Sequence, residues 1–157
     1  MLNREQFLET LNQACAALGF LKSNVIISHG GASLLHGLRD ETDDIDVAIP
    51  RHHWDTLLNL GLKARTLPPT GTHPAVEIIE HLDVDWHLTT KDQSVDMVNL
   101  HGYAVTRPLR LLRDRIALGR QKDMGDIKLL THLASQLSMK DYARMNELII
   151  QHLGPAQ

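Results

Sequence analysis

Cysteine is almost absent from this sequence, and so are long apolar runs. Cys15 is the one cysteine in 157 residues, so no disulfide can form within the chain, which fits a reducing compartment. No stretch approaches the ~20 apolar residues that a membrane-spanning helix needs. The N-terminus, with Arg4 and Glu5 among its first residues, lacks the apolar core of a signal peptide. These absences predict a cytoplasmic protein with no membrane partner.

An excess of positive charge is also missing. The formal net charge of −3 argues against a protein that coats nucleic acid through bulk charge, although a local basic groove stays open. The ten histidines form no His-x-x-x-His pair, and Cys-x-x-Cys is absent, so a zinc site is not expected. The length suits one domain, covering residues 1–157.

The most informative stretch runs from residue 25 to residue 50. An apolar, β-branched strand enters Gly30-Gly31, a short helix is expected from near Ala32, and a second apolar strand carries Asp44 and Asp46. Residues i and i+2 of a strand point to the same face, so both carboxylates are expected side by side, where a divalent cation offsets their repulsion. The glycines let the backbone approach a phosphate at the start of the helix. Together these features predict a site for a nucleotide and a metal ion.

The Gly-Gly turn followed by Asp44-Ile45-Asp46 with apolar flanks resembles the signature of the DNA polymerase beta-like nucleotidyltransferase superfamily. The resemblance covers about residues 25–130. It implies a minimal nucleotidyltransferase fold of the α/β class, with a short mixed β-sheet flanked by helices and a helical C-terminus. It also implies two ions of Mg²⁺ (or Mn²⁺), held by the two aspartates and by a third carboxylate on a later strand.

The third carboxylate is expected on a strand within residues 76–89. Alternation there places Leu82, Val84, Trp86 and Leu88 inward and puts Asp83 and Asp85 together on the other face. Val84-Asp85-Trp86-His87 resembles the form of this strand in small antibiotic nucleotidyltransferases, which favours Asp85 as the catalytic metal ligand. Asp83 stays open as the alternative.

Helices are predicted over residues 106–153. Arg120-Gln121-Lys122-Asp123 and the residues that follow resemble a segment of the small nucleotidyltransferases that include the AbiEii-type toxins. Lys122, at a helix entry, is expected to face the triphosphate, together with Gly30, Gly31 and a hydroxyl from Ser33. Arg39 and Thr42 are weaker candidates for ligand contact.

The resemblance implies an enzyme that transfers a nucleoside monophosphate from a nucleoside triphosphate (NTP) to a hydroxyl. Acceptors consistent with it are a tRNA 3′ end, a protein side chain, or an aminoglycoside- or lincosamide-like small molecule. Because the chain has no second domain to grip RNA, the acceptor is expected to be small or to be held with help from a homodimer or a protein partner. The alternative is a catalytically silent binding module with this fold, for example in a toxin-antitoxin pair.

Overall fold

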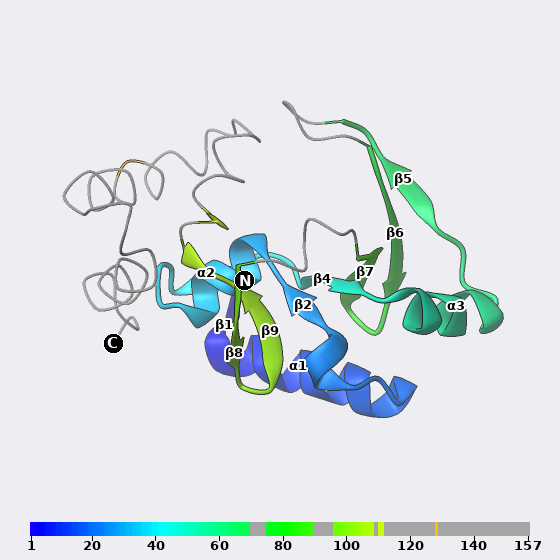
Figure 1. The fold of residues 1–157 in the computed structure, drawn as a ribbon, viewed down its shortest axis with the longest axis horizontal. Helices are drawn as coiled ribbons and strands as arrows, with labels where there is room; N and C mark the ends of the chain where they lie inside the picture. Colours follow the sequence, from blue (N-terminus) through cyan, green and yellow to red (C-terminus); the bar gives the residue numbers. More distant parts are fainter. Residues whose placement is uncertain (70–74, 90–95, 109, 112–127, 129–157) are drawn as a thin grey trace.

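The computed structural model of the chain describes residues 1–69, 75–89, 96–108, 110–111 and 128. Over these residues it contains three α-helices, a seven-stranded mixed sheet and a two-stranded sheet (Figure 1). The helices are α1 (Arg4–Leu18), α2 (His29–Leu35) and α3 (Arg51–Asn59), and a short 3-10 helix, η1 (Lys22–Asn24), precedes β2. The predicted α/β class and the mixed character of the sheet are therefore confirmed.

The large sheet has the strand order β5-β6-β7-β4-β2-β9-β8. Its strands are β2 (Ile26–Ile27), β4 (Asp46–Ile49), β5 (Arg65–Leu67), β6 (Val76–His81), β7 (Val84–Leu88), β8 (Met97–Leu100) and β9 (Tyr103–Thr106). Two pairs, β4 with β7 and β2 with β9, are parallel, and the other neighbours are antiparallel. The small sheet pairs β1 (Leu2–Asn3) with β3 (Glu41–Thr42). The order brings β2, β4 and β7, which carry the predicted site, next to one another in the middle of the sheet.

In the sequence, Asn3 with Gln6 three residues later predicts the start of a helix and Gly19 predicts its end, and α1 forms between them. Asn3 caps it by accepting from the Gln6 backbone N–H, while the Gln6 side chain accepts from the Asn3 backbone N–H. Gly19 ends the helix in the left-handed conformation, with a φ of 70°. Phe7 and Leu11 are fully buried, and the Tyr103 hydroxyl donates to Asn12 Oδ1 at 2.5 Å, so α1 packs near β9 (Figure 1).

The core is a row of apolar residues that runs across the sheet. Register aligns Ile79, Trp86, Val47, Ile27 and Val105 on five successive strands, and all five are buried. Each fully buried side chain of this size contributes roughly 1.5–3 kcal/mol. Successive side chains along a strand point to opposite faces of the sheet. The next row, which contains Glu80, Asp85 and Asp46, therefore points to the other face.

Three sequence-based expectations need correction. Helix α2 begins at His29 rather than near Ala32, so Gly30 and Gly31 lie inside its first turn. Asp44 precedes β4 instead of lying in it. Leu82 and Asp83 form the turn between β6 and β7, with φ values of 56° and 62°, so Leu82 does not point into the core and is 42% exposed.

The C-terminal prediction falls largely outside the described residues. Pro108, Arg110 and Leu111 are helical, in line with a helix that opens after Thr106. Lys122 and the rest of the segment predicted as helix, apart from the helical Lys128, lie beyond what the structure describes. Within the described ranges, no helix is both long and apolar enough to cross a membrane.

Candidate functional site

Carboxylates from three neighbouring strands form one row across the sheet. Glu80 on β6 is the register partner of Asp85 on β7, and Asp85 is the partner of Asp46 on β4. The Asp85 backbone N–H donates to the Ile45 carbonyl at 2.8 Å, which fixes this register one residue before β4 begins. Glu80 also pairs with Arg65 of β5, so its charge is compensated. Asp46 and Asp85 therefore form the acidic centre of the row.

The two central carboxyl groups hold a proton unequally. Burial raises the pKa of Asp85 to about 6, and the nearby charge of Asp46 adds to the rise. Burial also tends to raise the pKa of Asp46. Hydrogen bonding and charge interaction with His87, and a hydrogen bond with Asp85, outweigh this effect and leave the pKa below the ordinary value. Two like charges in contact oppose each other's ionisation, so the proton that leaves this pair last as the pH rises is the one on Asp85.

Two histidines lie around Asp46. His87, two residues after Asp85 on β7, places Nε2 3.7 Å from Asp46 Oδ1 and is largely buried. His29, at the start of α2, adds a smaller favourable charge interaction that also lowers the pKa of Asp46. The sequence analysis assigned no role to either histidine. The spacing Asp85-x-His87, which puts both side chains on one face of β7, was the available signal.

Asp44 and Asp83 line a hollow that Asp85 also lines. The hollow, of about 850 Å³, is lined by Asp44, Arg65, Glu80, Asp83 and Asp85, among others. The charge of Asp44 contributes to the raised pKa of Asp85, so the two carboxylates act on each other. Asp83, in the hairpin turn, has no register partner on β4, so the structure places Asp85 rather than Asp83 opposite Asp46.

Gly30 and Gly31 lie at closely packed positions. A Cβ on Gly31 would come within 2.6 Å of Phe7 Cζ and 2.9 Å of Ile27 Cγ2. A Cβ on Gly30 would come within 2.5 Å of Thr42 Oγ1 and 3.3 Å of Arg39 Nη1. Packing of α2 on its neighbours thus accounts for Gly31, whereas at Gly30 the missing side chain makes room for a guanidinium and a hydroxyl.

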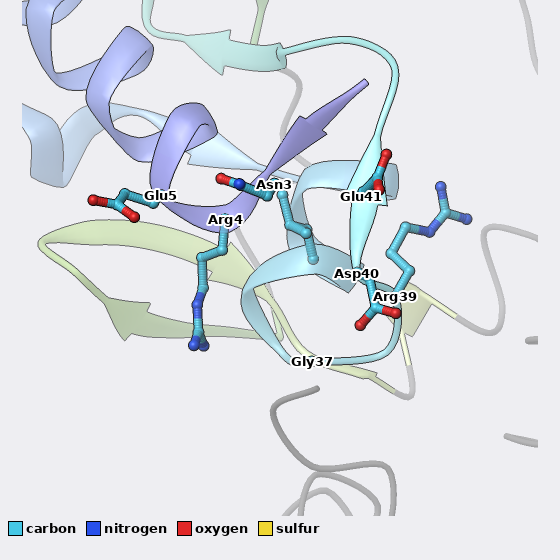
Figure 2. Close-up of a pocket in the computed structure, with 8 residues that line it drawn as sticks. Asn3, Arg4, Glu5, Gly37, Arg39, Asp40 and Glu41 are labelled. Carbon is cyan, nitrogen blue, oxygen red and sulfur yellow. The ribbon is translucent and has the colours of Figure 1, made fainter. Parts of the chain in front are cut away.

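Arg39 comes from the loop between α2 and β3. It also lines a smaller hollow of about 370 Å³ between the start of α1 and this loop. Figure 2 shows the Arg39 side chain extending away from the carboxylate of its neighbour Asp40. Because the Arg39 guanidinium also lies next to Gly30, a positive group is present at the start of α2, as a phosphate site would require.

Ser33 and the end of β2 lie where α2 packs against β9. Ser33 is fully buried, and its hydroxyl has no hydrogen-bond partner among the described residues. Ser28 Oγ instead lies 2.9 Å from Thr106 Oγ1 on β9. His36 Nε2 donates to the Thr106 carbonyl at 2.8 Å, and burial is the main reason that its pKa is lowered. These contacts join α2 to β9 and hold the glycine segment beside the sheet.

The donor chemistry of Asp44, Asp46 and Asp85 fits Mg²⁺ or Mn²⁺, which prefer carboxylate oxygens. Within the part of the chain that the structure describes, no three His, Cys, Asp or Glu side chains already converge as a metal-binding group. Asp46 and Asp85 are instead linked by a hydrogen bond. A cation bound there would be held by carboxylate oxygens of Asp44, Asp46 and Asp85, and its charge would favour the ionised form of Asp85.

Comparison with known proteins gave no relative. No protein-family model matches the chain, and neither a curated protein nor a solved structure does.

Proposed function

We propose that the chain is a metal-dependent nucleotidyltransferase that transfers a nucleoside monophosphate from an NTP to a hydroxyl acceptor. The observation that supports this most is the register of β4 and β7, which sets Asp46 opposite Asp85. The adjacent strand, β2, leads into the segment of Gly30 and Arg39. Anion-binding and cation-binding groups thus lie on neighbouring elements, as a metal-nucleotide complex requires.

The proposed roles follow the chemistry of each group. Asp44, Asp46 and Asp85 would hold the ions. Arg39 and the backbone N–H groups of Gly30 and Gly31, in the first turn of α2, would hold the triphosphate. Bound there, two ions of Mg²⁺ or Mn²⁺ would lower the pKa of the acceptor hydroxyl and stabilise negative charge on the phosphates. Lys122 keeps its predicted role on the triphosphate, and the full burial of Ser33 counts against a direct phosphate contact.

In the reaction, the acceptor oxygen attacks the α-phosphorus, and the bond between that phosphorus and the α–β bridging oxygen breaks. Pyrophosphate leaves with the electron pair of that bond. The proton of the acceptor hydroxyl passes to a carboxylate oxygen of Asp85, which acts as the general base. The hollow beside Asp85 would receive the acceptor, which would be an RNA 3′ end, a protein side chain or a small molecule.

A catalytically silent module with the same fold is the second candidate. It is favoured by the lack, among the described residues, of a preformed group of three metal-binding side chains. Such a module would keep the fold and a partner surface, with residual nucleotide binding or none.

The experiment is incubation with each α-labelled NTP, Mg²⁺ and fractionated cell extract, using the wild type and the Asp44→Asn/Asp46→Asn double variant. Label that enters RNA, protein or a small molecule only with the wild type would support the enzyme and identify the class of acceptor. Binding of Mg²⁺ and NTP, measured by a rise in melting temperature, without labelling of any fraction would favour the silent module. Equal labelling by the double variant would contradict the proposed site.

A further inference from the structure

Ser28 lies beside the acidic pair, on the same face of the sheet. Ile27 of β2 is the register partner of Val47 on β4, and continuing this antiparallel register by one residue places Ser28 opposite Asp46. Ser28 has an extended backbone, with a φ of −127° and a ψ of −179°, so strand geometry holds at this residue. Residues opposite each other in an antiparallel pair share a face, so the acidic row continues into the hydroxyl of Ser28.

The hydroxyl of Ser28 bonds across the sheet rather than to the helix that follows it. Ser28 directly precedes α2, where a serine side chain normally accepts from a backbone N–H of the first turn. In α2, all of which the structure describes, no such bond is present. Ser28 Oγ instead lies 2.9 Å from Thr106 Oγ1 on the parallel neighbour β9. This contact extends the polar row from β4 through β2 to β9.

Thr106 is fixed from more than one side. It is only 4% exposed, and its carbonyl accepts from His36 Nε2 at 2.8 Å. Thr106 can therefore hold the Ser28 hydroxyl in one position. Ser28 is less buried than Thr106, so it is the member of the pair that can also reach a bound molecule.

The position of Ser28 suits a hydrogen-bond donor that carries no charge. Ser28 lies opposite Asp46 and two residues before Gly30, next to which the Arg39 guanidinium lies. The phosphate chain of a metal-nucleotide complex held by Asp46 and Arg39 would pass this point. A lysine there would pair with Asp46 and compete with the cation. A hydroxyl can donate to a phosphate oxygen and leave the carboxylate available to the metal.

We infer that Ser28 is a further ligand-binding residue of this site: its hydroxyl donates to a phosphate oxygen of the bound triphosphate, and Thr106 is the positioning residue that holds it there. This inference rests on the proposed function, because it assumes that the ions and the triphosphate bind between Asp46 and Arg39. In the bound state Thr106 Oγ1 donates to Ser28 Oγ, which leaves the Ser28 proton for the phosphate. Ser28 thus supplies the hydroxyl that the sequence pattern assigns to Ser33.

The test compares Ser28→Ala with Ser33→Ala, which makes the same change at a fully buried serine. Isothermal titration calorimetry measures the Kd of two probes: Mn²⁺ alone, and inorganic tripolyphosphate in the presence of Mg²⁺. Ser28→Ala is expected to bind tripolyphosphate roughly tenfold more weakly, because one hydrogen bond to a charged group is lost. It should bind Mn²⁺ alone like the wild type. Ser33→Ala should bind both probes like the wild type.

The double variant Ser28→Ala/Thr106→Val separates ligand binding from folding. Ser28→Ala alone leaves the buried Thr106 hydroxyl without this partner, whereas the double variant replaces both hydroxyls by apolar groups, which is close to neutral for stability. We expect the double variant to melt within a few degrees of the wild type and to bind tripolyphosphate as weakly as Ser28→Ala. Wild-type affinity of the double variant for tripolyphosphate would overturn the inference. An equal loss of Mn²⁺ affinity would also overturn it, because the hydroxyl would then serve the carboxylates.

The positioning role of Thr106 has its own comparison. Thr106→Val should weaken tripolyphosphate binding by a few fold, and Thr106→Ser, which keeps the hydroxyl, should bind like the wild type. Equal binding by Thr106→Val and the wild type would overturn this role.

Asp46→Asn makes the failure of this inference distinguishable from the failure of the proposed function. If the wild type binds both probes, Asp46→Asn loses Mn²⁺, and Ser28→Ala binds both probes like the wild type, the role of Ser28 fails while the proposed metal site stands. If the wild type binds neither probe, or Asp46→Asn binds Mn²⁺ as well as the wild type, the proposed function fails and the role of Ser28 fails with it.

Discussion

Asp46 and Asp85 lie opposite each other on the parallel strands β4 and β7, and their pKa values move in opposite directions. Burial, together with the charge of Asp46, raises the pKa of Asp85 to about 6. Burial also tends to raise the pKa of Asp46, but the interactions with His87 and the hydrogen bond with Asp85 keep this pKa below the ordinary value. One carboxyl group of the pair is thus ready to lose a proton near neutral pH, while the other is already ionised.

The raised pKa of Asp85 predicts how its removal changes stability. Folding favours the protonated form of Asp85. The stability that protonated Asp85 contributes is therefore fully present at low pH and is lost as the pH rises through about 6. We expect Asp85→Asn to increase the free energy of unfolding at pH 8 by about 1 kcal/mol, because solvent screens part of the repulsion between the two carboxylates. At pH 4 the gain should be much smaller. Urea unfolding in the presence of EDTA at both pH values measures it.

Asp83→Asn is the matched control for this prediction, because Asp83 lies two residues away in an exposed turn. It makes the same chemical change away from the position opposite Asp46, so it should not reproduce the gain in stability at pH 8. A gain for Asp85→Asn that is equal at pH 4 and pH 8 would contradict the assigned pKa shift.

The same two variants should differ in activity once the acceptor class is known. Asp85→Asn removes both a proposed metal ligand and the proposed proton acceptor, so transfer of labelled nucleotide should fall by roughly 10²-fold or more. Asp83→Asn should keep most of the transfer. Since Asp85→Asn is expected to be more stable than the wild type at pH 8, unfolding would not explain its loss of activity. The reverse ranking would make Asp83 the third carboxylate.

Stability should also depend on the cap of α1. Asn3→Ala removes the acceptor for the Gln6 backbone N–H, and about 1 kcal/mol of unfolding free energy should be lost. Gln13→Ala, an exposed change in the same helix, should alter stability by less than about 0.5 kcal/mol. Chemical denaturation of the two variants gives the comparison. Equal effects would mean that the cap does not stabilise the fold.

Local signals in the sequence predicted local structure well. The capping box at Asn3 and the stop at Gly19 predicted α1, because both depend on contacts within a few residues. The opposition of Asp46 and Asp85 depends on strand register, which a sequence pattern does not contain. The choice between Asp83 and Asp85 stayed open for the same reason, since alternation of apolar residues continues unbroken through the left-handed turn at Leu82 and Asp83.

The glycine segment shows a second limit of the sequence pattern. Gly30-Gly31 predicted a turn that serves a phosphate, but both residues lie inside α2. What Gly31 needs is the absence of a Cβ against Phe7, a contact between residues far apart in the chain. The left-handed backbone belongs to His29, for which the sequence gives no sign.

The packing at Gly31 leads to a final prediction. In Gly31→Ala the new Cβ would lie 2.6 Å from Phe7 Cζ, so α2 or the ring must shift, at a cost of roughly 1–3 kcal/mol of stability. Phe7→Leu shortens the clashing side chain, so the double variant should be less destabilised than the sum of the two changes, by roughly 0.5–3 kcal/mol. Urea unfolding of all four proteins completes this cycle.

Gly61→Ala provides the control for that cycle. Gly61 has a φ of +83° and no atom within 4 Å of the position of a Cβ, so its substitution costs stability through backbone strain alone. Phe7→Leu should not relieve this cost. If Gly31→Ala instead unfolds like the wild type but no longer gains melting temperature from Mg²⁺ with ATP, Gly31 would be kept for the nucleotide rather than for the packing of α2 on α1.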